Sequence, residues 1–163
     1  MIKIKTIEFD ITKLSDALGI PVWSVRELFS DGRPVSFIIK QRLAVDMGWG
    51  LADKNDDYDW IDEFGNYVES RVLTRHGVSF VPNKMLGTGR YFEQEGFLTK
   101  LNIVEFFIVT DVTRFPFVHF YKIDSGQIRK WYHSGKILDG GKLTVGAFFR
   151  ILQQPDLFDG EIE

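Results

Sequence analysis

The sequence predicts an α/β (α+β) fold in which helices flank a central mixed β-sheet. Short runs rich in β-branched and aromatic residues alternate with segments whose apolar residues recur about four apart, which is the pattern of strands mixed with helices. The chain has 163 residues, of which 44% are hydrophobic, and 15 Phe and 4 Trp supply much of the apolar surface. We expect a single domain over residues 1–154, followed by an acidic tail at 155–163.

The first third of the chain is expected to form one strand and three helices. Residues 1–9 place apolar side chains at intervals typical of a strand, and residues 12–30 predict two short helices interrupted at Gly19-Ile20-Pro21. Ser36 is placed to cap a third helix that runs to about Met47. Residues 12–47 thus form an N-terminal helical segment.

The remainder is expected to build most of the sheet. Phe115-Pro116 lies between two β-rich runs and predicts a β-hairpin there. The expected elements, in order, are two short strands around Glu63-Phe64-Gly65 with the second at about 67–74, a loop at 76–91, a helix at about 92–102, strands at 104–112, 117–123 and 127–131, and a helix at 143–152.

Composition narrows the class of protein. The chain has no cysteine, so disulfides and thiolate metal sites are excluded. No apolar run approaches the roughly 20 residues that cross a bilayer, and the first residues lack the apolar core of a signal peptide, so we expect a cytoplasmic protein without membrane contact. The net charge of −3 is not that of a non-specific nucleic-acid binder, although metal-binding carboxylates would also lower the pI.

The stretch from Asp59 to Arg71 carries the most informative pattern. With Glu63-Phe64-Gly65 as a three-residue hairpin loop, Asp59 falls directly across from Glu69. Two opposed carboxylates repel each other, and a bridging Mg²⁺ ion would remove that repulsion. Arg71 lies two residues after Glu69 and therefore on the same side of its strand. A metal pair beside a cation suits the hydrolysis of phosphodiesters, but the same three residues could also form a solvent-facing charge cluster.

The arrangement Asp59…Glu69-Ser70-Arg71 resembles the PD-(D/E)xK motif of restriction-endonuclease-like nucleases, and a looser similarity extends over about residues 58–131. The resemblance implies a Mg²⁺-dependent endonuclease of the type II restriction enzyme style, acting as a homodimer on double-stranded DNA. Asp59 and Glu69 would hold the metal.

Two residues depart from this motif. Tyr58 replaces its proline, and Arg71 replaces its lysine. Arginine cannot give up a proton. The family sometimes moves that lysine to a following helix, and either Lys100 or Lys84 could then serve.

The N-terminal helices resemble a helix-turn-helix. Leu14, Leu18, Val25 and Leu28 would form its internal core, and Gly19 would permit the turn. The exposed face of the second helix would then offer contacts to DNA, although two ordinary packed helices would give the same pattern. The weaker candidates for contact with DNA are Trp23, Ser24, Arg26, His76, Lys84 and Arg90.

Two other hypotheses stay open beside the nuclease. One is a non-catalytic DNA-binding protein, either a helix-turn-helix regulator or a nuclease fold that has lost its chemistry. The other is an interaction protein without a nucleic-acid partner, which the acidic pI favours.

Overall fold

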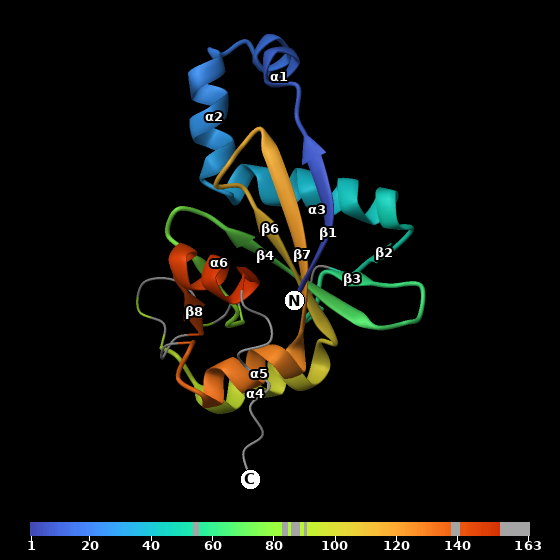
Figure 1. The fold of residues 1–163 in the computed structure, drawn as a ribbon. Coiled ribbons are helices and arrows are strands. Elements are labelled where there is room, and N and C mark those ends of the chain that lie inside the picture. The colour runs from blue at the N-terminus through green and yellow to red at the C-terminus, as the bar shows by residue number, and fades with distance from the viewer. Residues whose placement is uncertain (54–55, 83–84, 86–88, 90, 138–140, 154–163) are drawn as a thin grey trace.

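A six-stranded mixed sheet, curled into a half-barrel, forms the centre of the molecule (Figure 1). The computed structural model describes residues 1–53, 56–82, 85, 89, 91–137 and 141–153. The strand order is β1-β7-β6-β4-β3-β2, and a separate two-stranded sheet pairs β5 with β8. The strands are β1 (Ile2–Glu8), β2 (Gly50–Leu51), β3 (Trp60–Ile61), β4 (Tyr67–Leu73), β5 (Val78–Ser79), β6 (Phe106–Asp111), β7 (Phe117–Asp124) and β8 (Lys142–Leu143).

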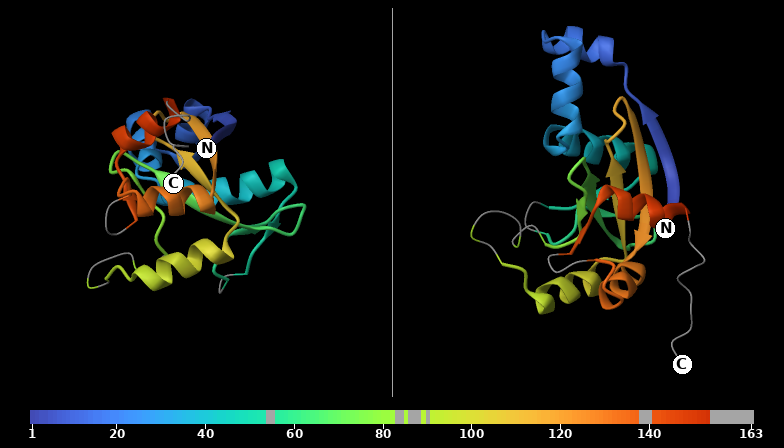
Figure 2. Two further views of the ribbon diagram at one scale, coloured as in Figure 1. Left: turned by 60° about the horizontal axis from the view of Figure 1, so that its bottom comes forward. Right: turned by 60° about the vertical axis from the view of Figure 1, so that its left-hand side comes forward.

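Helices cover both faces of the sheet, so the expected mixed sheet with flanking helices is confirmed. Helix α3 packs on one face, whereas α4, α5 and α6 lie on the other, and α1 and α2 extend beyond one end of the strands (Figures 1 and 2). The helices are α1 (Ile11–Leu18), α2 (Val22–Ser30), α3 (Arg33–Met47), α4 (Gln94–Ile103), α5 (Ser125–His133) and α6 (Val145–Gln153).

Strand β6 divides the core into two clusters, because successive side chains of a strand point to opposite faces. Phe107 and Val109 belong to the cluster under α4, α5 and α6, while Phe106 and Ile108 belong to the cluster under α2 and α3. All six residues of β6 are buried. The strand therefore joins both halves of the hydrophobic core.

The pair β4–β6 is parallel, whereas every other pair of neighbouring strands in the large sheet is antiparallel. A parallel pair needs a crossover connection, and α4 lies within that connection. The crossover places α4 beside the middle of β4, which decides which side chains meet there.

Two local predictions are wrong. Residues 127–131 lie in helix α5, not in a strand, and the buried Ile128 and Trp131 are three positions apart, as one face of a helix requires. Ser36 is not a cap, because α3 begins at Arg33 and its N-cap is Gly32. Pro34 in the first turn favours this earlier start, since its fixed φ suits a helix there.

Candidate functional site

The hairpin between β3 and β4 has the predicted register over its paired residues. Trp60 lies opposite Val68, the N–H of Asp62 donates to the carbonyl of Asn66 at 3.0 Å, and Gly65 has the left-handed φ of +82° that its place in the loop requires. The N–H of Asp59, however, donates to the carbonyl of Val68 at 2.9 Å. Asp59 is therefore not paired directly with Glu69, which corrects the prediction.

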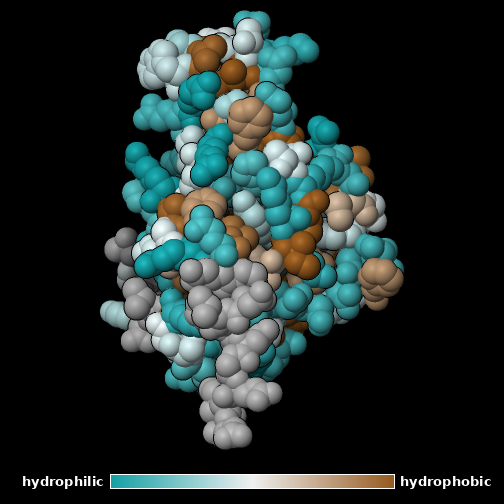
Figure 3. All heavy atoms as spheres, viewed as in Figure 1, coloured by the Kyte–Doolittle hydropathy of each residue, from teal (hydrophilic) through white to brown (hydrophobic). Residues whose placement is uncertain are grey.

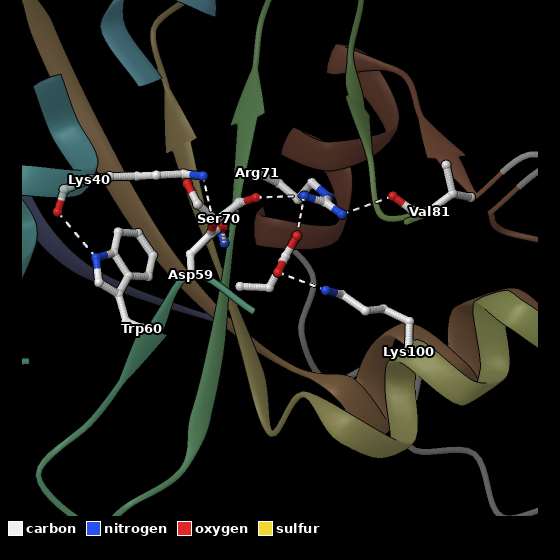
Figure 4. Close-up of polar contacts among 8 residues, drawn as sticks. Lys40, Asp59, Trp60, Ser70, Arg71, Val81 and Lys100 are labelled. Carbon is white, nitrogen blue, oxygen red and sulfur yellow. Dashed lines mark hydrogen bonds and ion pairs between the residues drawn. The ribbon is translucent and has the colours of Figure 1, made fainter. Parts of the chain in front are cut away.

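Asp59 is held from the α3 side of the sheet. One carboxylate oxygen accepts a hydrogen bond from the N–H of Ser70 at 2.7 Å, and the other is ion-paired with the ammonium group of Lys40. The indole N–H of Trp60 donates to the carbonyl of Lys40 at 3.1 Å and so fixes α3 against the hairpin. Figure 4 shows Lys40 approaching Asp59 from α3, away from Lys100.

Glu69 is held from the opposite side and is only 3% exposed. Its Oε1 lies 2.5 Å from Nη1 of Arg71, and its Oε2 accepts a hydrogen bond from Nζ of Lys100 at 2.8 Å. Lys100, on α4, is itself 6% exposed (Figure 4). Buried charges are stable only when they are paired, and these three side chains form one buried ion-paired unit of two cations and one carboxylate.

Arg71 shares the side of β4 that Glu69 occupies, as predicted, but it is no solvent-facing cation. Its Nη1 donates to the carbonyl of Ser70 at 2.9 Å and its Nη2 to the carbonyl of Val81 at 2.8 Å. The guanidinium also lies 6.0 Å from the ring centroid of Phe107. These contacts fix the fork of Arg71 against Glu69.

The two carboxylates of Asp59 and Glu69 are ligands of the type that Mg²⁺ prefers, because that ion takes one or two carboxylates and keeps several waters. All four carboxylate oxygens of Asp59 and Glu69 already accept from N–H groups, and three of those donors are cationic side chains. A metal ion would therefore compete with Lys40 for Asp59 and with Arg71 and Lys100 for Glu69. Among the described residues, no group of three or more His, Asp or Glu side chains could hold a metal.

The structure decides between the two candidate lysines in part. Lys100 reaches Glu69, whereas Lys84 lies outside the described residues, as does Arg90. His76 lies apart from the acids, where it accepts a hydrogen bond from Nε of Arg75 at 3.2 Å and lines a cavity beside β4.

The N-terminal helices form as predicted, with Gly19 left-handed between them, but their predicted core is wrong in part. Val25 is buried, whereas Leu18 is 52% and Leu28 is 45% exposed. The reason is that α2 turns Val25 and Phe29 toward the sheet cluster instead of toward α1. Figure 3 shows apolar side chains on the surface at this end of the molecule.

The candidate DNA contacts on α2 differ in their surroundings. Trp23 is 67% exposed, Ser24 is half-buried, and Nη1 of Arg26 donates to the carbonyl of Phe115 at 3.2 Å. Trp23 and Arg26 are thus both exposed, and Arg26 is anchored by one nitrogen to Phe115.

Sequence reasoning missed Lys40. The residue follows the buried Ile39 on α3, and nothing in its local pattern marks it as a partner for Asp59, 19 positions away. The one feature of the sequence that sets Lys40 apart is its position beside the apolar face of the predicted helix. Its role depends on how α3 packs on the sheet.

Comparison with models of known protein families, with curated proteins and with solved structures found no match. In the part of the chain that the structure describes, no helix is both long enough and apolar enough to cross a membrane.

Proposed function

We propose that the protein is a metal-dependent endonuclease that hydrolyses phosphodiester bonds of double-stranded DNA, in the style of type II restriction enzymes and as a homodimer. The observation that carries this proposal is the 2.8 Å hydrogen bond from Lys100 to Glu69. Arg71 occupies the motif position of a lysine but cannot give up a proton. Lys100 brings an ammonium group to the same carboxylate from the following helix.

The roles of the residues follow from their contacts. Asp59 and Glu69 would hold Mg²⁺, which would polarise the phosphate and activate water. Arg71 is anchored to two carbonyls and positions Glu69. Lys100 would donate a hydrogen bond from its ammonium group to an oxygen of the reacting phosphate, where it would stabilise the developing negative charge.

The test is incubation of several plasmid DNAs with the purified protein in Mg²⁺, in Mn²⁺ and in EDTA. We expect cutting with either metal and none in EDTA. Asp59→Ala and Lys100→Met should abolish cutting, whereas Lys13→Met, at a lysine whose side chain is 85% exposed on α1, should leave it unchanged. Cutting that survives Asp59→Ala would refute the proposed site.

A non-catalytic DNA-binding protein is the second candidate. It is favoured by the engagement of all four carboxylate oxygens, since a site that has lost its chemistry can keep its acids as structural ion pairs. This candidate expects DNA binding in EDTA that weakens steeply with salt, because phosphate contacts release counterions. It also expects no cutting under any condition. Absence of binding across the salt series would exclude DNA as the partner.

A further inference from the structure

A cavity of about 500 Å³ lies between the N-terminal end of α3 and one edge of β4. It is broadly open to solvent, and its size falls within the range of pockets that hold small molecules. Gly32 brings α3 close to the strand, because a Cβ at this position would lie 2.8 Å from side-chain atoms of Val72 and Thr74. The wall next to the acidic site is formed by Lys40, Ser70 and Arg71, and the far wall by residues that include His76, Ser79 and Lys142.

On the side away from β6, β4 is paired with β3 only at Tyr67 and Val68, and the rest of this edge meets the cavity. The carbonyls of Tyr67 and Leu73 accept hydrogen bonds from the β6 side, so the odd-numbered residues of β4 direct their backbone groups at β6. The backbone N–H and carbonyl groups of the even-numbered residues therefore point away from β6. Ser70 donates its N–H to Asp59, and the next such residue, Val72, lies on the cavity wall. The cavity therefore has backbone polar groups as well as side chains.

The lining of the cavity is more basic than acidic. Lys40, Arg71 and Lys142 line it, and the first two are already paired with Asp59 and Glu69, whereas Asp31 is the one acid among the described lining residues. Within that part of the chain Lys142 makes no ion pair, so its charge is available. Hydrogen bonds between charged groups are about twice as strong as neutral ones.

Two residues that line this cavity also carry a buried polar atom that lacks a partner among the described residues. These atoms are Nε of Arg71, whose residue is only 8% exposed, and Oγ of Ser79. Buried polar groups without a hydrogen bond are rare and costly, so each such group calls for a partner. A tetrahedral anion with several acceptor oxygens can take hydrogen bonds from cations and hydroxyl groups on different walls at once.

We propose that this cavity binds the phosphate group of a nucleotide or of a DNA strand without a metal ion. The proposal goes beyond the nuclease function, because the binding needs neither Mg²⁺ nor cleavage. Lys40 belongs to both sites, since it is paired with Asp59 and lines the cavity. Lys142 and Ser79 belong only to the cavity, so they allow the two proposals to be tested separately.

The experiment measures binding by titration calorimetry on the full chain in EDTA. The probes are inorganic phosphate, a nucleoside monophosphate, and a single-stranded oligonucleotide with and without a 5′-phosphate. We expect Lys142→Gln to weaken binding about tenfold, the loss of one charge-assisted hydrogen bond. Ser79→Ala should weaken it less, and Lys13→Gln, remote on α1, should not change it. Thermal unfolding of each variant checks that the fold is intact.

The outcomes separate the sources of the phosphate. Binding of the monophosphate supports a free nucleotide, and binding of only the 5′-phosphorylated oligonucleotide supports a strand end. Absence of binding by every probe, or equal affinity in wild type and Lys142→Gln, overturns the proposal even if the protein cuts DNA. Conversely, phosphate binding that Lys142→Gln weakens sustains it even if no DNA is cut.

Discussion

At the residue scale, the two acids of the site differ in how their charge is balanced. Glu69 is buried with two cations, and removal of either leaves a partner in place. Asp59 has one cation, Lys40, and one backbone N–H. Asp59 is therefore the acid whose environment a single substitution changes most.

Substitution of Lys40 by methionine should strengthen the binding of Mg²⁺ or Mn²⁺. The ammonium group competes with a metal for Asp59, and its removal leaves a partly buried carboxylate without a counterion. We expect divalent ions to raise the melting temperature of Lys40→Met more than that of the wild type.

Lys5→Met is a control matched in exposure, and its partner Asp46 keeps the guanidinium of Arg42 after the substitution. Lys5 and its partner Asp46 are 30% and 16% exposed, against 29% and 17% for Lys40 and Asp59, but they lie away from Glu69. An equal response to metal in both variants would contradict a metal site at Asp59.

At the scale of the element, Gly77 lies in the tight turn that connects β4 of the large sheet with β5 of the small sheet. Gly77 has a φ of +93°, and a Cβ at this position would lie 2.1 Å from the carbonyl oxygen of Leu143, next to the β5–β8 pair. Both the backbone conformation and the space therefore require glycine.

Gly77→Ala should lower the free energy of unfolding by more than about 1 kcal/mol, since alanine fits neither the left-handed conformation nor the space. Gly126→Ala is the control, because Gly126 lies in α5, where an added Cβ would have nothing within 4 Å, and it should be neutral or slightly stabilising. Urea denaturation measures both. A small effect at Gly77 would show that β8 can move away from the turn.

The free energy of unfolding should depend on pH through His119, which lies on β7 opposite Thr6 of β1. Burial lowers the pKa of His119 from 6.5, and the charges of Lys3 and Arg114 lower it further, while Asp111 opposes the shift. The unfolded chain therefore takes up a proton at a higher pH than the folded one. The free energy of unfolding should fall as the pH drops below about 6.5 and level off below the folded pKa.

His119→Gln should remove this part of the pH dependence. Denaturation of both proteins across pH 5–8 checks it, and an unchanged slope in the variant would assign the dependence to other groups. Thr6 Oγ1 lies 3.0 Å from Nδ1 of His119 and can hydrogen-bond to glutamine as well, so the variant should still fold.

The sequence predicted most elements because they depend on local patterns. The β3–β4 register followed from the loop and Gly65, and the shared side of Glu69 and Arg71 followed from strand alternation. What it could not predict depends on packing between distant segments. Lys40 meets Asp59 through the placement of α3, and the short run at 127–131 gave too few residues to separate a strand from helix α5.

At the scale of the whole molecule, the sheet is shared by both hydrophobic clusters through β6. Trp131 belongs to one cluster, and Trp49 and Trp60 belong to the other. Because alternate residues of one strand serve both, neither cluster can lose its packing without exposing the other.

Unfolding should therefore be one cooperative transition. Variants that keep either Trp131 or Trp49 as the sole tryptophan, with phenylalanine at the other three positions, allow each cluster to be followed by fluorescence. Each variant should show the same midpoint by fluorescence and by circular dichroism. Fluorescence and circular dichroism midpoints that differ within one variant would mean that the two faces unfold separately.

The pairing of β1 with β7 also sets an order of events during synthesis. Thr6 and His119, which meet across these strands, lie 113 positions apart. At roughly 5–20 residues per second, about 6–23 s pass between their incorporation by the ribosome. The first strand made is thus among the last to find its neighbour, and until then its edge is open to nascent chains on nearby ribosomes.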